Sequence, residues 1–197
     1  MIVSEKNRSP IVDDDWEYSW APYDAPTYRA VLNHILPNDV ILEIGAGDLR
    51  RAREMALIAQ KVYAVEINAL VLDQGLRSGH PLPGNLIPIR ADAQTLDFPP
   101  DITSGVLLMR HSTHFQLYAE KLKSAGCEKL ITNARWHMDV ECIPLQSPGI
   151  SFEQIEIGWY ACWCGKVGFK SGPVEKITPE LDAIIHKVFD CPDCLKY

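Results

Sequence analysis

The 197-residue sequence lacks an apolar run approaching the roughly 20 residues that a membrane-spanning helix requires. Its polar start, Met1–Arg8, does not resemble a signal peptide, so we expect no membrane association and a cytoplasmic location. Positive charge is also scarce, since 19 Lys and Arg face 26 Asp and Glu, for a net charge of -7. This balance disfavours a generally basic nucleic-acid-binding surface, although it does not exclude a local basic patch.

The composition is that of a globular protein, with 47% hydrophobic and 23% charged residues, which excludes wholesale disorder. The length suits one domain with a small appendage. Six cysteines are present, and in a reducing compartment they indicate metal ligands or free thiols rather than disulfides.

Short apolar runs alternate with segments of helical spacing along the first two thirds of the chain. This alternation predicts right-handed crossovers and a mostly parallel, doubly wound α/β sheet covered on both faces. The predicted strands are residues 40–44, 62–66, 86–90, 105–109 and 129–132, and the predicted helices are residues 26–36, 49–60, 69–76 and 115–125.

The sequence divides into three parts. Residues 1–24 form an irregular aromatic arm, residues 25–135 the α/β core, and residues 136–197 a β-rich extension. In the extension we expect extended segments at 136–145, 152–162 and 166–170, followed by a closing helix at 179–188.

A glycine turn, Gly45-Ala46-Gly47, follows the first predicted strand. Glycines let a ligand approach the backbone closely, and the start of the next helix offers unpaired N–H groups to a polar or anionic group. Arg50 occupies the position where a dinucleotide site has its third glycine, and no Gly-Lys-Ser/Thr follows, so NAD, FAD and phosphate-loop sites are disfavoured.

Two carboxylates follow the next strands. Glu66 closes the second strand and lies at the same carboxyl edge of the sheet, where an acid can accept hydrogen bonds from both hydroxyls of a ribose. Asp92, after the third strand, would lie beside the same crevice, within reach of an exocyclic amine such as that of adenine.

These segments resemble the first three motifs of class I S-adenosylmethionine-dependent methyltransferases, over residues 39–133. The amino-acid sequences of the first two motifs are similar to those of the rRNA adenine dimethyltransferases. The resemblance implies that S-adenosylmethionine is the cofactor and that the residues which bind it are Glu43, Gly45, Ala46, Gly47, Glu66, Ile67, Asp92 and Ala93. Glu43 would lie under the glycine turn, Gly45 and Gly47 against the methionine part, Glu66 at the ribose, and Asp92 and Ala93 around the adenine.

The sequence departs from this family in three places. Leu49 replaces a frequent third glycine, and the Pro-Pro-aromatic motif of adenine and amide methyltransferases is missing after the fourth strand. The helix that usually follows the fifth strand is hard to locate. The methyl acceptor, whether small molecule, RNA or protein, is therefore left open.

Candidate catalytic residues follow the fourth strand. His111 and His114 lie where the reacting methyl group should point, and histidine can serve as a base near neutral pH. Alternatively, Ser112 or Thr113 simply caps the next helix.

Two other features allow two interpretations each. The rings of the arm, Trp16, Tyr18, Trp20 and Tyr23, either fold over the cofactor and acceptor or cover an edge of the core. The arginines at 50, 51 and 53 either grip a phosphate or, as we prefer, form a solvated helix face.

Four cysteines near the C-terminus form two close pairs, Cys162/Cys164 and Cys191/Cys194. The second pair is a Cys-x-x-Cys knuckle, and together the pairs predict one tetrahedral zinc site with a structural role, iron being the alternative. Cys127 and Cys142 stand alone and are expected to be buried as small apolar residues.

Two functions are compatible with these features. The first is a methyltransferase that uses S-adenosylmethionine, and the second is a non-catalytic module that binds the cofactor or a partner and has a zinc-stabilised tail.

Overall fold

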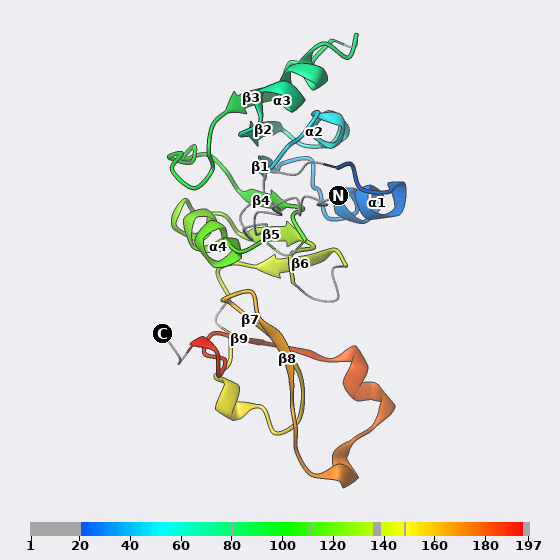
Figure 1. Ribbon diagram of the computed structural model, residues 1–197, viewed down its shortest axis with the longest axis vertical. Helices are drawn as coiled ribbons and strands as arrows, with labels where there is room; N and C mark the ends of the chain where they lie inside the picture. Colours follow the sequence, from blue (N-terminus) through cyan, green and yellow to red (C-terminus); the bar gives the residue numbers. More distant parts are fainter. Residues whose placement is uncertain (1–20, 80, 111, 136–138, 148, 195–197) are drawn as a thin grey trace, which may run out of the picture.

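The computed structural model describes residues 21–79, 81–110, 112–135, 139–147 and 149–194. These residues form a six-stranded sheet with helices, and a separate three-stranded sheet near the C-terminus (Figure 1). Trp16, Tyr18 and Trp20 of the predicted arm lie outside the described residues.

The larger sheet has the strand order β3-β2-β1-β4-β5-β6, in which only β6 is antiparallel to its neighbour. Chain order reverses between β1 and β4, so this is the point where open α/β sheets bind ligands. The strands are β1 (Val40–Ile44), β2 (Lys61–Glu66), β3 (Leu86–Arg90), β4 (Ser104–Leu107), β5 (Lys129–Thr132) and β6 (Glu141–Pro144).

Helices and apolar side chains cover both faces of this sheet, which explains why β1 is buried along its whole length. One face packs against α1 (Ala25–Leu32), α2 (Arg50–Ala56) and α3 (Ala69–Leu76). The other packs against α4 (Phe115–Ser124) and the loop that follows β3. The predicted doubly wound, mostly parallel sheet is therefore confirmed.

The predicted core elements occur in the predicted order, and the main difference is the length of the second helix. Residues 49–60 were expected to be helical, but α2 ends at Ala56. The side-chain amide of Asn85 donates to the carbonyl oxygens of Ala56 (2.9 Å) and Ala59 (3.0 Å). These bonds satisfy carbonyls that a longer helix would have used internally.

The β-rich extension contains β7 (Gly158–Cys162), β8 (Val167–Lys170) and β9 (Ile185–Val188), in the order β8-β7-β9. A short 3-10 turn at Phe152–Gln154 precedes β7, and two more at Val174–Lys176 and Pro179–Ala183 lie between β8 and β9. The prediction of a closing helix at 179–188 is wrong, because only Pro179–Ala183 turns and the rest forms β9. Pairing of β9 with β7 outweighs the local helical pattern and buries Val188.

The six-stranded sheet extends past the boundary expected near residue 135, because β6 pairs with β5. Arg135 joins the two sheets: its guanidinium pairs with Glu141 of β6 and donates to the carbonyl oxygen of Cys162 of β7 (2.9 Å). Among the described residues, no helix has the length and apolar character needed to cross a membrane.

Candidate cofactor pocket and cysteine cluster

A pocket of about 530 Å³ opens at the carboxyl ends of β1, β2, β3 and β4. Segments that are distant in sequence meet in its wall: Ile44–Ala46 after β1, Val65–Ile67 at the end of β2, Ala91–Gln94 after β3 and Leu108–Arg110 after β4. The size is within the range of pockets that hold small molecules and cofactors.

The glycine turn adopts a conformation that requires glycine. Gly45 and Gly47 have φ values of 72° and 57°, and a Cβ on Gly45 would lie 3.3 Å from Cε of Met109. The amides of the turn itself are occupied, because the Gly45 and Ala46 N–H groups both donate to the carbonyl oxygen of Val65 (2.9 Å each). The turn therefore offers close approach rather than free donors.

Leu49 takes the place of the family's third glycine and keeps a glycine-like backbone. Its φ is 64°, and it is the only non-glycine residue with positive φ in the described part of the chain. Its side chain is fully buried in the core beside α2. Burial of the leucine offsets a left-handed conformation that costs roughly 1–2 kcal/mol.

Glu66 connects the glycine turn to the second strand. Its Oε2 accepts a hydrogen bond from the Gly47 N–H (2.8 Å) and its Oε1 accepts one from the Asn68 N–H (2.7 Å). The side chain lines the pocket with only 5% of the residue exposed. A carboxylate has about four acceptor positions, so each oxygen keeps capacity for a further donor.

Asp92 and Ala93 also line the pocket, next to the exposed side chain of Ile67. Asp92 Oδ1 accepts a hydrogen bond from the Gln94 N–H (2.8 Å), which tightens the turn after β3. Lys121 of α4 holds this turn from behind, because its ammonium donates to the carbonyls of Ala93 (2.6 Å), Gln94 (2.9 Å) and Leu96 (2.8 Å).

Glu43 is fully buried within β1, and it forms an ion pair with the buried Arg51 of α2. Burial raises the pKa of Glu43 above its usual range, while the charge of Arg51 acts in the opposite direction. Because Arg51 also lines the pocket, this pair connects the middle of the sheet to the pocket wall.

The arginines of α2 do not form the solvated face that the sequence suggested. Arg51 is buried, and Arg53 donates to the carbonyls of Pro81 and Gly75, each at 3.0 Å. Arg50 is the exposed one, and it pairs with Asp48. Sequence spacing alone did not reveal a buried carboxylate opposite Arg51.

Tyr23, the one ring of the arm within the described residues, closes one side of the pocket. Its hydroxyl accepts a hydrogen bond from the Arg110 N–H (3.2 Å), and the Arg110 guanidinium lies 5.1 Å from its ring centroid. The Tyr23 N–H donates to the hydroxyl of Tyr28 (3.0 Å), whose ring packs on the core. The Tyr23 ring thus packs against the core and also lines the pocket, and its contact with a cofactor or acceptor stays a prediction.

Of the two candidate catalytic histidines, the structure describes only His114. His111 lies outside the described residues. His114 is half-buried at the start of α4, where its ring Nδ1 lies 3.2 Å from Oγ1 of Thr113. Its N–H donates to the Ser112 hydroxyl (3.3 Å), and it is not among the described residues that line the pocket.

Several wall residues were not predicted as site residues. They come from the loop after β4 and from helices beside the pocket, and they belong to no recognisable sequence motif. These residues are Tyr28, Arg51, Met109, Arg110 and Tyr118.

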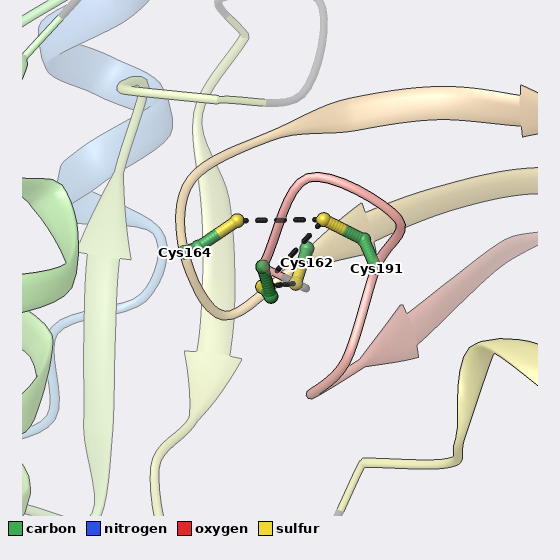
Figure 2. A group of neighbouring side chains, drawn as sticks. Cys162, Cys164 and Cys191 are labelled. Atoms are coloured by element: carbon green, nitrogen blue, oxygen red, sulfur yellow. Dashed lines mark hydrogen bonds between the residues drawn. The ribbon is translucent and has the colours of Figure 1, made fainter. Parts of the chain in front are cut away.

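The four C-terminal cysteines converge between β7 and the turn that follows β9 (Figure 2). All their sulfur atoms lie within 4.8 Å of one another, and three pairs are 3.5–3.6 Å apart: Cys162/Cys194, Cys164/Cys191 and Cys191/Cys194. Four thiolates about 2.3 Å from one tetrahedral zinc ion are roughly 3.8 Å apart. The donor set therefore fits a single metal ion.

The surroundings of these thiols shift their pKa values in different directions. Burial of Cys191 acts to raise its pKa, but hydrogen bonds from the Cys194 and Asp193 backbone lower that pKa below its usual value. Burial raises the pKa of Cys194 to about 11, and the neighbouring thiols Cys162 and Cys191 act in the same direction. Cys127 is completely buried away from the cluster, and burial raises the pKa of its thiol to about 12. Cys142 is half-buried in β6 and also stands apart from the cluster.

No model of a protein family and no curated protein matches this chain. Solved structures do match. One is a precorrin 8w decarboxylase from Methanobacterium thermoautotrophicum, with 22% identity and a TM-score of 0.50, over 62% of this chain and 70% of that chain. The core has a methyltransferase-like fold.

Two methyltransferases are also similar. The 23S rRNA methyltransferase ErmE has 23% identity and a TM-score of 0.48, over 56% of this chain and 46% of that chain. Phosphoethanolamine N-methyltransferase 1 of Haemonchus contortus, in complex with phosphoethanolamine and S-adenosylhomocysteine, has 18% identity and a TM-score of 0.46, over 60% and 26%. This chain therefore spans less than half of each enzyme's length.

Proposed function

We propose that this protein is an S-adenosylmethionine-dependent methyltransferase. The observation that carries the proposal is the shared pocket: the glycine turn, Glu66 and Asp92 follow three successive parallel strands and line or border one cavity of about 530 Å³. The structural neighbours that are methyltransferases support the same reading.

Glu66 would bind the ribose, because each of its oxygens keeps an acceptor position after bonding the Gly47 and Asn68 amides. Asp92 and Ala93 would frame the adenine, and Ile67 would cover its face. Gly45 and Gly47 would let the methionine part approach the backbone of the turn, and Glu43, near the end of the strand before it, would help to position the turn.

The bound cofactor supplies an electrophilic methyl group, so the protein has to align an acceptor with it and exclude water. Tyr23, Met109, Arg110 and Tyr118 enclose the part of the pocket next to the loop after β4. His111 and His114 follow that loop, and we propose them as bases for an acceptor that keeps its proton near neutral pH. The acceptor class, whether small molecule, RNA or protein, is not part of the proposal.

We also propose that Cys162, Cys164, Cys191 and Cys194 hold one structural zinc ion. Four protein ligands leave no open coordination position, so the metal would stabilise the extension rather than take part in methyl transfer.

Calorimetry with S-adenosylhomocysteine tests the cofactor assignment. We expect wild-type protein to bind at concentrations well below about 1 mM, and Glu66→Gln to weaken binding by about tenfold or more, because a charged acceptor is lost. Glu54→Gln, on an exposed position of α2, is the matched control and should bind like wild type.

The 2′-deoxy analogue of S-adenosylhomocysteine makes the test specific for the ribose. Wild type should prefer the hydroxylated ligand, and Glu66→Gln should lose that preference. Absence of binding to wild type would favour a non-catalytic partner-binding module. An undiminished preference in Glu66→Gln would show that Glu66 does not bind the ribose.

A further inference from the structure

A second pocket of about 260 Å³ lies where the extension meets the six-stranded sheet. Its wall combines one helix, the edge strand of the larger sheet and the start of the cysteine cluster. The described residues that line it are Lys123, Arg135, Ile143, Pro144, Ser147, Gly149, Trp163, Lys187, Val188 and Phe189.

The pocket is positively charged, although the protein as a whole is acidic. None of its described lining residues is acidic. The charge of Arg135 is matched by Glu141, but no carboxylate within the described part of the chain forms an ion pair with Lys123 or Lys187. The pocket therefore presents the ammonium groups of Lys123 and Lys187 without a direct ion pair in the described part of the chain, although Glu141 also attracts Lys187 electrostatically.

Two aromatic rings accompany these cations. The ammonium of Lys123 lies 5.4 Å from the centroid of the Trp163 ring, which covers that ring's face. Phe189 is 57% exposed and so offers an open ring beside the pocket. An exposed phenylalanine next to a cationic pocket is suited to stacking on a flat, uncharged ring.

Both rings are close to the cysteine cluster in the sequence. Trp163 stands between Cys162 and Cys164, and Phe189 comes two residues before Cys191. The Trp163 N–H donates to the carbonyl of Val188 (2.9 Å), which joins the two ring-bearing segments. The extension thus presents a fixed arrangement of rings and charges.

We propose that this pocket binds single-stranded nucleic acid, with a phosphate between Lys123 and Lys187 and a base against Phe189. Paired cations suit a phosphate, and an exposed ring suits an unstacked base of any sequence. A phosphorylated peptide would satisfy the lysines but not require the ring.

The site is separate from the proposed cofactor pocket, because the two pockets share no described lining residue. Helix α4 contributes Tyr118 to one pocket and Lys123 to the other, about 7.5 Å further along the helix axis. Nucleic-acid binding can therefore be measured without cofactor, and its failure would leave the cofactor assignment untouched.

Fluorescence anisotropy with a labelled oligouridylate RNA of about 12 nucleotides tests the proposal at two salt concentrations. We expect wild-type protein to bind the RNA. The double variant Lys123→Gln/Lys187→Gln should bind at least tenfold more weakly, and its log K against log[salt] slope should be shallower by about 1.4. Phe189→Ala should weaken binding by about tenfold with an unchanged slope.

Two control variants separate these effects from general charge and folding. Arg77→Gln removes an exposed charge directly after α3. Phe169→Ala removes a half-exposed ring of β8 that packs on Trp159 of β7. Both should bind like wild type. The proposal would be overturned if wild-type protein did not bind the RNA, or if the double variant bound it as tightly as Arg77→Gln. It would also be overturned if a phosphopeptide of the same charge displaced the RNA as well as unlabelled RNA does.

Discussion

At the level of single residues, a buried ion pair joins Glu43 to Arg51. Glu43 and Arg51 are both buried, and the pair links the central strand to the first helix after the turn. Taking one member away would leave the other as an uncompensated buried charge, which typically lowers stability by about 3–5 kcal/mol.

We therefore expect Arg51→Met to lower the free energy of unfolding by about 3–5 kcal/mol near neutral pH. The loss should be smaller in mild acid. Burial raises the folded-state pKa of Glu43 above its usual 4.5, so stability falls as the pH rises from that value through the folded pKa. Without Arg51 the folded-state pKa of Glu43 rises further, so the total loss of stability between mild acid and neutral pH should be larger.

Urea unfolding at about pH 5 and about pH 8 measures the difference. Arg50→Met removes a half-exposed arginine from the same helix and should change stability by less than about 1 kcal/mol at either pH. An equal loss for Arg51→Met at both pH values would mean that Glu43 does not titrate as described.

Single residues differ in how far the sequence could place them. Glu66 and Asp92 could be placed at the pocket because the ends of parallel strands share one edge. Arg51 and Lys121 could not, because their partners are a buried carboxylate in a strand and carbonyls of a loop, and neither follows a sequence spacing. The same holds for the amides of Gly45 and Ala46, which the neighbouring strand occupies.

At the level of elements, α4 fixes the turn that we assign to the adenine. Lys121 reaches three carbonyls of that turn, and its ammonium lies 4.4 Å from the centroid of the Phe98 ring. Burial lowers the pKa of Lys121, whereas Asp97 and Asp92 act to raise it.

Lys121→Met should release this turn and weaken S-adenosylhomocysteine binding by about tenfold, since several hydrogen bonds to a charged donor are lost. Calorimetry measures the affinity, and a stability measurement confirms that the fold remains. Lys123→Met, two residues further along α4, should leave the affinity unchanged. Equal affinities of the two variants for S-adenosylhomocysteine would show that the hydrogen bonds of Lys121 do not shape the pocket.

Elements of the core follow from local patterns, and those of the extension do not. The apolar, β-branched runs at residues 40–44 and 129–132 could be predicted with their ends, because strands buried on both faces carry that pattern. Residues 179–188 look helical in isolation, but the strand Ile185–Val188 depends on β7, more than 20 residues away.

For the whole molecule, the extension has little core of its own. Its buried apolar cluster consists of Ile155, Cys162, Val188 and Cys191, so two of its four members are predicted metal ligands. Small units of this kind usually need a metal or disulfides to fold.

Metal analysis of purified protein should therefore return about one zinc ion per chain. Cys194→Ser should lose it, whereas Cys142→Ser, outside the cluster, should keep it. Chelation should unfold the extension in a separate transition and leave the six-stranded core folded. A metal-free protein with a single, unchanged transition would contradict the proposed zinc site.

The central claim is that the glycine turn, Glu66 and Asp92 together hold an adenosyl group. A crystal structure of the protein with S-adenosylhomocysteine tests it most directly. The account predicts the ribose hydroxyls within hydrogen-bond distance of Glu66 and the adenine beside Asp92 and Ala93. A ligand bound elsewhere, or a Glu66 carboxylate that contacts only the Gly47 and Asn68 amides, would contradict it.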